Sequence, residues 1–353
     1  MKILITGGAG FVGSSIGILL KQRYPHYQIF ALDNLKRRGS ELNLPRLKEA
    51  GIIFFHGDVR NPEDFNELPE INFIIEASAE PSVLAGINST PDYLVNTNLS
   101  GTVNCLNFAV KKNANFIFLS TSRVYPINQI EKIIYEEKET RFNIKEKQNI
   151  SGISLTGISE DFPLEGYRSI YGATKLCSEY LINEYQHFYN LKTVINRCGV
   201  LTGPWQMGKV DQGVVVLWMA RHFWKQDLSY IGFNGSGKQV RDILHVNDLF
   251  ELTDYQIHNI DKINGETYNV GGGKDVSVSL KELTHYCSEI SGNTISINEV
   301  KENRTADISL YITDNSKVTA ATGWEPKTGT KEILKNIYDW IKNNEQQLYP
   351  ILK

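Results

Sequence analysis

The sequence predicts an α/β protein with a doubly wound parallel sheet and a smaller mixed α/β lobe toward its C-terminus. Short apolar runs with many β-branched and aromatic residues have the length of buried strands; they are residues 2–6, 28–33, 52–59, 72–78 and 115–120. Stretches with helical spacing separate the first two runs and the last two. A glycine-rich turn directly follows the first run. Strands that alternate with helices form parallel sheets with helices on both faces.

The second half of the chain begins with a break in this pattern. Residues 127–168 are charged and contain glycine and serine, so we expect a surface excursion, of the kind that often forms a lid. A helix is expected from 171 to 188 and a strand over 192–201. Beyond them, short strands mix with helices at 279–290 and 331–344.

Composition narrows the class of partner. The chain has 353 residues, of which 41% are hydrophobic, and a net charge of −3. It contains no block of Lys and Arg that would indicate nucleic acid or an anionic membrane, so a small-molecule partner is favoured. The first residues already form a strand and a turn, unlike a signal peptide, and no apolar run approaches bilayer length. We therefore expect a cytoplasmic protein.

The four cysteines are scattered and show neither metal-type nor CxxC spacing; they are Cys105, Cys177, Cys198 and Cys287. This distribution fits a reducing compartment, with most thiols buried. We predict no disulfide and no metal site.

The strongest local signal is the turn after the first strand, where Gly7, Gly10 and Gly13 stand at intervals of three residues. The first glycine permits a tight turn, the second lets backbone N–H groups approach a pyrophosphate, and the third lets the helix pack close to the strand. The positive end of the helix then faces the phosphates. This context predicts a dinucleotide-binding Rossmann turn, to which Phe11 and Val12 also belong.

An acidic residue follows at the distance that a dinucleotide requires. Asp33 ends the second strand, twenty residues after Gly13, and a carboxylate there accepts both adenosine ribose hydroxyls and repels a 2′-phosphate. The position favours NAD over NADP. Lys36, Arg37 and Arg38 follow closely and leave NADP as the alternative. Asp58, at the end of the third strand, is placed to meet the adenine edge, or else caps the strand.

The second signal is the motif YGATK, in which Tyr171 and Lys175 lie one helical turn apart on one face. A lysine ammonium stabilises a neighbouring phenolate, so a tyrosine in this arrangement can act as a general base near neutral pH. Alone, the motif is a common chance match. Beside a dinucleotide turn it predicts a catalytic pair.

With these motifs the sequence resembles the extended short-chain dehydrogenase/reductases that act on nucleotide sugars. The resemblance covers essentially the whole chain and is carried by seven motifs: TGGAGFVG (6–13), DNL (33–35), GDV (57–59), NTNLSGTVN (96–104), STSRVY (120–125), YGATK (171–175) and GKQVRDILHVNDL (237–249).

The resemblance implies roles for individual residues. The catalytic residues would be Thr121, which hydrogen-bonds the reacting sugar hydroxyl, with Tyr171 and Lys175. The residues that would bind NAD are Gly7, Gly10, Phe11, Val12, Gly13, Asp33, Asn34, Arg37, Asp58, Val59, Ala77, Ser78, Asn98, Ser120, Tyr171 and Lys175. The residues that would bind the nucleotide sugar are Arg123, Asn196, Asp211, Gln212, Gln239, Arg241 and Arg304.

It also implies a division of the chain. Residues 1–195 would form the NAD-binding domain, with 127–168 as the excursion near the active site. Residues 196–353 would form the substrate-binding lobe, of which about 238–260 would return to the first domain. Relatives of this kind are often dimers or tetramers, so we expect a homo-oligomer.

The motif STSRVY limits the reaction. Relatives that are 4,6-dehydratases carry Asp-Glu after the threonine, because elimination needs an acid and a base, whereas this chain has Ser122 and Arg123. The remaining groups can move a hydride off a carbinol and return it, which is epimerisation. Residues 203–219 look most like the CDP-paratose (CDP-tyvelose) 2-epimerase group. A CDP-hexose 2-epimerase is therefore favoured; the alternatives are a UDP-hexose 4-epimerase and a non-catalytic NAD-binding regulatory protein.

One segment departs from the family pattern. After the fourth strand the chain reads EASAEPSV, where many relatives have a histidine and an Ala-Gly-Gln type of loop. We therefore expect Glu76, Ser78 and Glu80 to distinguish the cofactor and substrate contacts of this chain from those of many relatives.

Overall fold

The computed structural model describes residues 1–87, 90–208 and 212–353. The chain forms two compact units, each assembled from three separate segments. Unit 1 consists of Met1–Val124, Ser169–Arg197 and Leu249–Tyr268. Unit 2 consists of Tyr125–Arg168, Cys198–Asp248 and Asn269–Lys353. The expected functional domains, 1–195 and 196–353 with about 238–260 returning to the first, stay a prediction.

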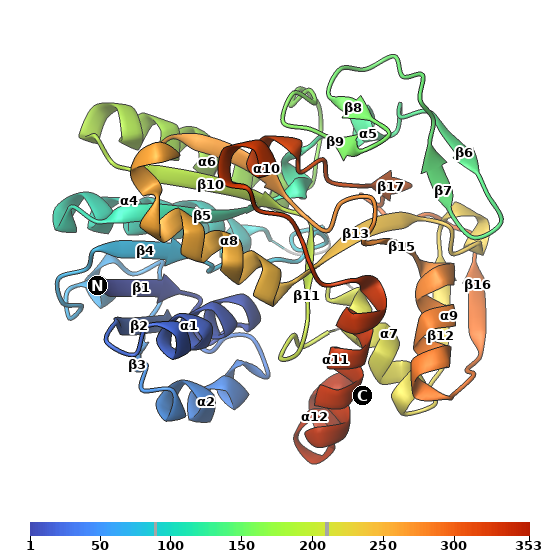
Figure 1. Ribbon diagram of the computed structural model, residues 1–353, viewed down its shortest axis with the longest axis horizontal. Coiled ribbons are helices and arrows are strands. Elements are labelled where there is room, and N and C mark those ends of the chain that lie inside the picture. The colour runs from blue at the N-terminus through green and yellow to red at the C-terminus, as the bar shows by residue number, and fades with distance from the viewer. Residues whose placement is uncertain (88–89, 209–211) are drawn as a thin grey trace. The chain divides into compact units, whose positions relative to one another are not determined.

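Unit 1 contains the large sheet and the helices that cover it (Figure 1). In chain order its elements are β1 (Lys2–Thr6), α1 (Phe11–Arg23), β2 (Gln28–Asp33), η1 (Ser40–Asn43), α2 (Leu44–Glu49), β3 (Ile53–His56), η2 (Pro62–Phe65), β4 (Phe73–Glu76), α3 (Asp92–Val95), η3 (Asn96–Ser100), α4 (Gly101–Lys112), β5 (Asn115–Thr121), η4 (Ser122–Val124), α6 (Ile170–Tyr189), β10 (Thr193–Cys198), α8 (Val246–His258), η6 (Ile260–Lys262) and β14 (Glu266–Val270).

The seven strands of this sheet follow the order β14-β10-β5-β4-β1-β2-β3. β1 pairs in parallel with both β2 and β4, so the chain winds outward from β1 in one direction and then in the other. Right-handed crossovers then place the helices of the two halves on opposite faces. The predicted doubly wound α/β fold is confirmed.

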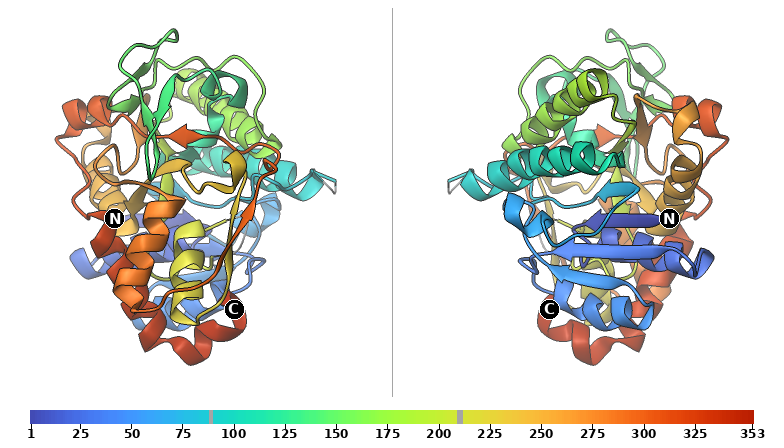
Figure 2. Two further views of the ribbon diagram at one scale, coloured as in Figure 1. Left: turned by 90° about the vertical axis from the view of Figure 1, so that its right-hand side faces the viewer. Right: turned by 90° about the vertical axis from the view of Figure 1, so that its left-hand side faces the viewer.

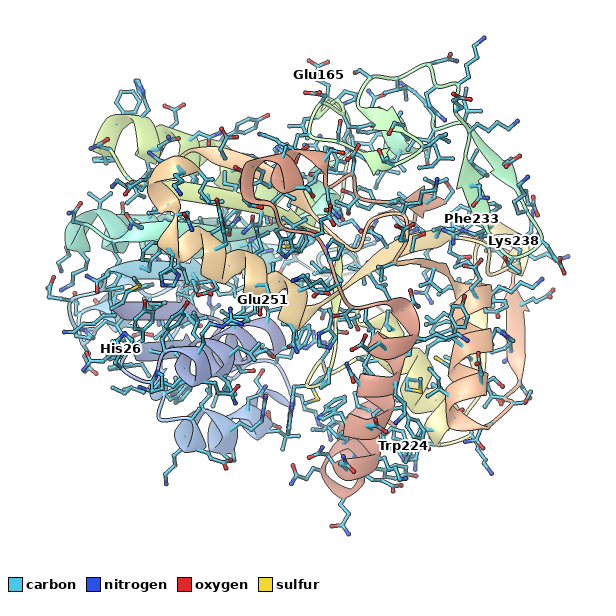
Figure 3. The ribbon with its side chains drawn as sticks, in the orientation of Figure 1. His26, Glu165, Trp224, Phe233, Lys238 and Glu251 are labelled. Carbon is cyan, nitrogen blue, oxygen red and sulfur yellow. The ribbon has the colours of Figure 1, made fainter. Side chains whose placement is uncertain are left out.

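The helices fall into two groups, one on each face of the sheet. α1 and α8 share one face, because Arg23 contacts Glu251 and Asp254 of α8 at 2.6 and 2.9 Å (Glu251 is labelled in Figure 3). α4 packs against α6, and the right-hand view of Figure 2 shows them side by side. The core of unit 1 lies beneath them, where Leu4, Ile74 and Phe116 from three strands are fully buried with Leu106 of α4. Burying each such side chain contributes about 1.5–3 kcal/mol.

Unit 2 is built from small sheets and a helical cluster. Its elements are α5 (Ile127–Ile130), β6 (Tyr135–Glu137), β7 (Phe142–Ile144), β8 (Ile153–Ser154), β9 (Gly157–Ile158), β11 (Val200–Thr202), α7 (Val214–Phe223), β12 (Leu228–Ile231), η5 (Phe233–Gly235), β13 (Val240–His245), β15 (Ser277–Ser279), α9 (Leu280–Ser291), β16 (Ile297–Val300), β17 (Leu310–Tyr311), α10 (Ser316–Thr322), α11 (Thr330–Asn343) and α12 (Glu345–Leu352). β13 is the centre of one sheet, between β11 and β15, and also pairs with β17; α7, α9 and α11 pack on one another.

The segment 127–168 is structured, which its average polarity did not suggest. It forms α5 and two short hairpins, β6–β7 and β8–β9. Phe142 is buried, and its ring lies 6.1 Å from that of Phe233, while Lys238 contacts Glu137 at 2.8 Å (Phe233 and Lys238 are labelled in Figure 3). A few apolar side chains therefore anchor this segment within unit 2.

Local signals explain why the helices begin where they do. Ser169 caps α6, because its hydroxyl accepts a hydrogen bond from the Gly172 N–H. Ser279 and Glu282 form a reciprocal capping box at the start of α9, and Gly292 ends that helix with a left-handed φ of 70°. The predicted helices at 171–188, 279–290 and 331–344 are confirmed within a residue or two. Within the described ranges, no helix is both long enough and apolar enough to cross a membrane.

A buried ion pair ties α6 to β10. Arg197 donates to Glu179 at 2.8 Å, and the two side chains are only 8% and 3% exposed. The Ser120 hydroxyl donates to the same carboxylate at 2.5 Å. Removing one partner of a buried pair leaves an uncompensated charge, which costs more than losing a surface pair.

We predict that Arg197→Leu lowers the free energy of unfolding by about 3–5 kcal/mol, because Glu179 would remain buried without its cation. Chemical denaturation monitored by circular dichroism measures the change. The matched control is Lys331→Leu, which breaks the exposed pair with Glu289 and should leave the unfolding midpoint close to wild type. A loss below about 1 kcal/mol in the Arg197 variant would mean that the pair contributes no more than a surface one.

Candidate active site

The turn between β1 and α1 packs backbone against backbone. Gly7 adopts a φ of +64°, and its carbonyl accepts a hydrogen bond from the Gly10 N–H at 2.9 Å. A Cβ at Gly13 would lie 2.3 Å from the Gly7 carbonyl oxygen, and one at Gly7 would lie 2.8 Å from the Ala77 carbonyl oxygen. Only glycine fits this close approach. The start of α1, with its outward N–H groups, is therefore held tightly against the end of β1.

Asp33 is tied to this turn by its own side chain. One carboxylate oxygen accepts the Ala9 N–H at 3.1 Å and the other accepts the Leu35 N–H at 2.8 Å. Burial raises the pKa of Asp33, while these backbone N–H groups oppose the shift. Leu35 has a positive φ of 54°, in the left-handed region that non-glycine residues adopt uncommonly. The carboxylate is thus fixed beside the glycine turn, as the NAD prediction requires.

Asp58 is held by a cation that the sequence did not point to. Arg60 contacts the carboxylate at 2.6 Å, and the Asn34 amide donates to it at 2.8 Å. Burial alone would raise the pKa of Asp58, but the hydrogen bonds from Arg60 and Asn34 outweigh it and lower the pKa to about 2. Asp58 is therefore charged at neutral pH, and an adenine amino group would have to share it with Arg60.

The remaining expected cofactor residues of unit 1 line or support the ends of β3 and β4. The Ser78 hydroxyl lies 3.1 Å from that of Thr6, next to the Ala77 backbone that faces Gly7. Asn98 lies in the π-helical turn η3, a distortion that is frequent at functional sites. Its amide holds Glu80 through hydrogen bonds of 2.8 and 3.1 Å.

Other members of the expected set have structural partners. The Val59 carbonyl accepts a hydrogen bond from Asn104 at 2.8 Å, which ties the end of β3 to α4. Phe11 and Val12 open α1, and Arg37 lies on the loop after β2. The Ser120 hydroxyl is used by Glu179. Their part in binding the cofactor stays a prediction.

The three expected catalytic residues all lie in unit 1. Thr121 is the last residue of β5, and its hydroxyl oxygen accepts the Arg123 N–H at 3.2 Å, which leaves the hydroxyl proton available for donation. Tyr171 lies in the first turn of α6 and Lys175 in the next, and α6 packs on β5 and η4. Lys175 is only 1% exposed, and its Nζ lies 3.7 Å above the centre of the Phe118 ring. The arrangement supplies a tyrosine, a buried lysine and a hydroxyl.

Two of the expected substrate residues also belong to unit 1. Arg123 lies in η4, directly after Thr121. Asn196 is completely buried in β10, where its amide exchanges two hydrogen bonds of 2.8 Å with Gln256. This pairing gives Asn196 a structural task, and its role in substrate binding stays a prediction.

The other expected substrate residues fall in unit 2 or outside the described ranges. Arg241 lies in β13 and donates to Asp307 at 3.1 Å. Gln239 is nearly buried beside it, and its side-chain carbonyl oxygen has no hydrogen-bond partner within the described chain. Gln212 precedes α7, and Arg304 lies between β16 and β17. Asp211 lies outside the described residues.

Some residues at the site were not among those expected from the sequence. Arg60 holds Asp58, and the Asn43 amide donates to the Ala9 carbonyl at 2.9 Å. Glu76 is completely buried and accepts a hydrogen bond from Thr102 at 2.7 Å. Of these residues, only Glu76 stands out in the sequence, where it departs from the family pattern after the fourth strand. In the described part of the chain, no cluster of three or more His, Cys, Asp or Glu residues could hold a metal ion.

This fold and this turn define a dinucleotide-binding α/β protein of the Rossmann type, with a tyrosine–lysine pair on the helix after the fifth strand of the sheet. Residues 3–271 match the model of the NAD dependent epimerase/dehydratase family. The chain belongs to this family, which confirms the resemblance, and NAD is its cofactor. It is an enzyme family that acts on nucleotide sugars.

Two sequence relatives cover almost the whole chain. The CDP-paratose 2-epimerase of Salmonella typhi is 31% identical over 358 residues, which span 97% of this chain and 100% of the relative. The UDP-glucuronate 4-epimerase of Thermodesulfobacterium geofontis is 27% identical over 354 residues, 97% and 96% of the two chains. Among solved structures, the UDP-glucose 4-epimerase of Thermus thermophilus in complex with NAD has a TM-score of 0.77 and 26% identity, and the match covers 97% and 99% of the two chains.

The residues of unit 1 fit NAD. The glycine turn has no room for a side chain at Gly7 or Gly13, so backbone N–H groups can approach a pyrophosphate. The Asp33 carboxylate stands beside that turn, where a 2′-phosphate would be repelled.

We predict that Gly13→Ala weakens NAD binding by roughly tenfold or more, the equivalent of about 1.4 kcal/mol, because the new Cβ must displace the Gly7 carbonyl. Equilibrium titration with NAD measures the affinity. Gly329→Ala is the control, since a Cβ there would meet nothing within 4 Å and the φ of −73° suits alanine. Equal affinities in the two variants would show that the close approach at Gly13 does not shape the cofactor site.

Proposed function

We propose that the protein is an epimerase of a nucleotide-activated hexose, and that it inverts C2 of a CDP-hexose of the paratose, tyvelose or glucose type. The observation that carries the proposal is the end of β5, where Thr121 is followed by Ser122 and Arg123 and not by two acids. The nearby pair of Tyr171 and Lys175 can then move a proton on oxygen, while an acid–base pair for elimination is absent from the positions where dehydratases carry it. The similarity to a CDP-paratose 2-epimerase supports the choice of sugar and carbon.

Each catalytic residue has a distinct task in this proposal. When bound, NAD supplies a reversible hydride acceptor for the carbon that carries the hydroxyl. Tyr171 takes the hydroxyl proton, and the Lys175 ammonium stabilises the phenolate that does so. Thr121 donates a hydrogen bond to the same substrate oxygen and polarises the carbonyl of the resulting 2-keto sugar. The sugar then turns about its bond to the diphosphate, so that the hydride would return to the opposite face of C2 while Tyr171 gives the proton back to the same oxygen.

The residues that would hold the nucleotide sugar are also proposals. We assign the diphosphate to Arg241 and Arg304, since guanidinium groups form paired hydrogen bonds with phosphate oxygens. Arg241 is engaged by Asp307, which fixes its direction before any ligand binds. The sugar end is assigned to Arg123, Asn196, Asp211, Gln212 and Gln239, and the substrate lobe to residues 196–353.

We further propose a cytoplasmic homo-oligomer. Two large aromatic side chains are exposed at the C-terminal end of α6: Phe188 is 72% exposed and Tyr189 59%. Adjacent exposed aromatic side chains favour burial against a second copy.

The direct test is incubation of the purified protein with CDP-, UDP- and GDP-hexoses, followed by NMR of the products. The proposal expects interconversion of two CDP-hexoses that differ only at C2. Inversion of a UDP-hexose at C4 would establish the 4-epimerase, which the 27% identity to a UDP-glucuronate 4-epimerase makes the second candidate. Bound NAD with no turnover of any sugar would instead indicate a non-catalytic NAD-binding protein.

We predict that Tyr171→Phe lowers turnover by roughly a hundredfold to ten-thousandfold while NAD stays bound, because the base is lost and the helix is kept. The matched control is Tyr180→Phe, an exposed tyrosine of the same helix, which should keep wild-type turnover. Turnover and NAD content are measured on the same preparations. If the Tyr171 variant kept more than about a tenth of wild-type turnover, Tyr171 would not be the base.

We predict that Asp33→Ala narrows the preference for NAD over NADP, because the variant no longer repels a 2′-phosphate and retains Lys36, Arg37 and Arg38 nearby. The ratio of the two dissociation constants is the measurement. An unchanged ratio, or NADP in the protein as purified, would mean that Lys36, Arg37 and Arg38, and not Asp33, determine which dinucleotide binds.

A further inference from the structure

Glu76 is an acidic side chain inside the sheet, at the level of the catalytic residues. It is the last residue of β4, pairs in register with Thr6 of β1 and Phe118 of β5, and is 0% exposed. One carboxylate oxygen accepts the hydrogen bond from Thr102 of α4. The other oxygen has no hydrogen-bond partner within the described chain. A buried carboxylate with one unpartnered oxygen is costly, which calls for a reason to keep it.

The register of the sheet indicates what this carboxylate faces. Residues paired across parallel strands project to the same face, so Glu76 and Phe118 point to the same side of the sheet. On that side, the Nζ of Lys175 lies 3.7 Å above the Phe118 ring. Thr102, which holds Glu76, comes from the helix that packs beside the one that carries Lys175. The buried carboxylate and the buried ammonium therefore lie over neighbouring strands on one face.

Electrostatics support this placement. Burial raises the pKa of Glu76, and its net value is about 7. The positive charge of Lys175 and the hydrogen bond from Thr102 favour the ionised carboxylate, so they make the rise smaller than burial alone would. The other titratable group that faces it is Cys105 of α4, whose pKa burial raises well above its usual value, so its thiol is neutral near pH 7. Within the described chain, Lys175 is thus the charge that couples to Glu76.

We propose that Glu76 is a positioning residue that acts through Lys175 and sets how strongly the lysine charge assists proton transfer at Tyr171. The inference rests on the proposed roles of Tyr171 and Lys175. An ionised Glu76 offsets the field of the ammonium, whereas a neutral Glu76 leaves the full positive charge to act on the phenolate. Whether the Glu76 carboxyl group is protonated therefore determines how easily Tyr171 forms its phenolate.

The first experiment reads the coupling without any substrate. Carbon NMR of the glutamate carboxyl carbons is followed against pH in the purified protein with its NAD, and Glu76→Gln assigns the resonance by its disappearance. We expect this resonance to titrate near pH 7 in wild type. In Lys175→Met and in Thr102→Val it should titrate at higher pH, since each change removes a group that favours the charged form. A resonance that titrates in the ordinary range of glutamate, or that ignores Lys175→Met, would overturn the inference.

The second experiment reads the consequence in the pH profile of kcat/KM. Glu76→Gln removes the negative charge at every pH, so the phenolate of Tyr171 forms more easily and the acidic limb should move to lower pH by about half a unit or more. Glu70→Gln, a change of an exposed glutamate in the turn before β4, should leave the profile in place.

The two readouts separate the possible failures. A fall in kcat/KM by the same factor at every pH in Glu76→Gln would show a merely structural role and contradict the proposal. If no sugar nucleotide is turned over, the proposed function fails, and the carboxyl titration still decides whether Glu76 and Lys175 are coupled. Should Glu76→Gln fail to fold, Thr102→Val retains the carboxylate and must shift its titration upward for the inference to stand.

Discussion

Unit 1 depends above all on the burial of one ammonium group, that of Lys175. A lysine that is 1% exposed loses nearly all of its hydration, so the charge persists only if the protein supplies compensation. The structure supplies it from two strands: the face of the Phe118 ring below, and the charge of Glu76 beside it. Glu76 ends β4 and pairs with Phe118 of β5, close to the edge of the sheet where α/β proteins bind their ligands. The fold brings these groups together, because β4 and β5 are neighbours in the sheet and α6 packs on β5.

A site residue is predictable from the sequence when its role depends on neighbouring residues, and is not when its partner lies far away in the chain. The glycine turn, Asp33 and the Tyr171–Lys175 spacing are local patterns whose meaning is fixed by strand and helix geometry, and the structure places all of them in unit 1. Long-range partners leave no such pattern. Thr102 lies 26 residues from Glu76, and nothing in either local sequence predicts their hydrogen bond. The segment 127–168 was expected at the surface because its average is polar, yet single residues such as Phe142 and Phe162 are buried.

The side chains at the carboxyl edge of the sheet also limit the chemistry. Thr121 ends β5 with its hydroxyl turned back to the Arg123 N–H, and the next two positions carry no acid. In the proposed mechanism Tyr171 moves a proton on a substrate oxygen, and those two positions offer no carboxylate to take one from carbon. Such a set favours a reaction in which a hydroxyl-bearing carbon is oxidised and restored, with no net redox change. The Cys198 thiol in β10, which is buried, fits packing better than proton abstraction.

The measurement that tests this account most directly is the fate of solvent hydrogen during turnover. An epimerase that removes and returns the same hydrogen at one carbon leaves that carbon without label, so the product formed in deuterated water should contain no carbon-bound deuterium. Mass spectrometry and NMR of the product sugar, after exchangeable hydroxyl protons are washed back to ordinary water, give the count. A gain of one carbon-bound deuterium per turnover would contradict the account, because it requires a base aimed at a C–H bond.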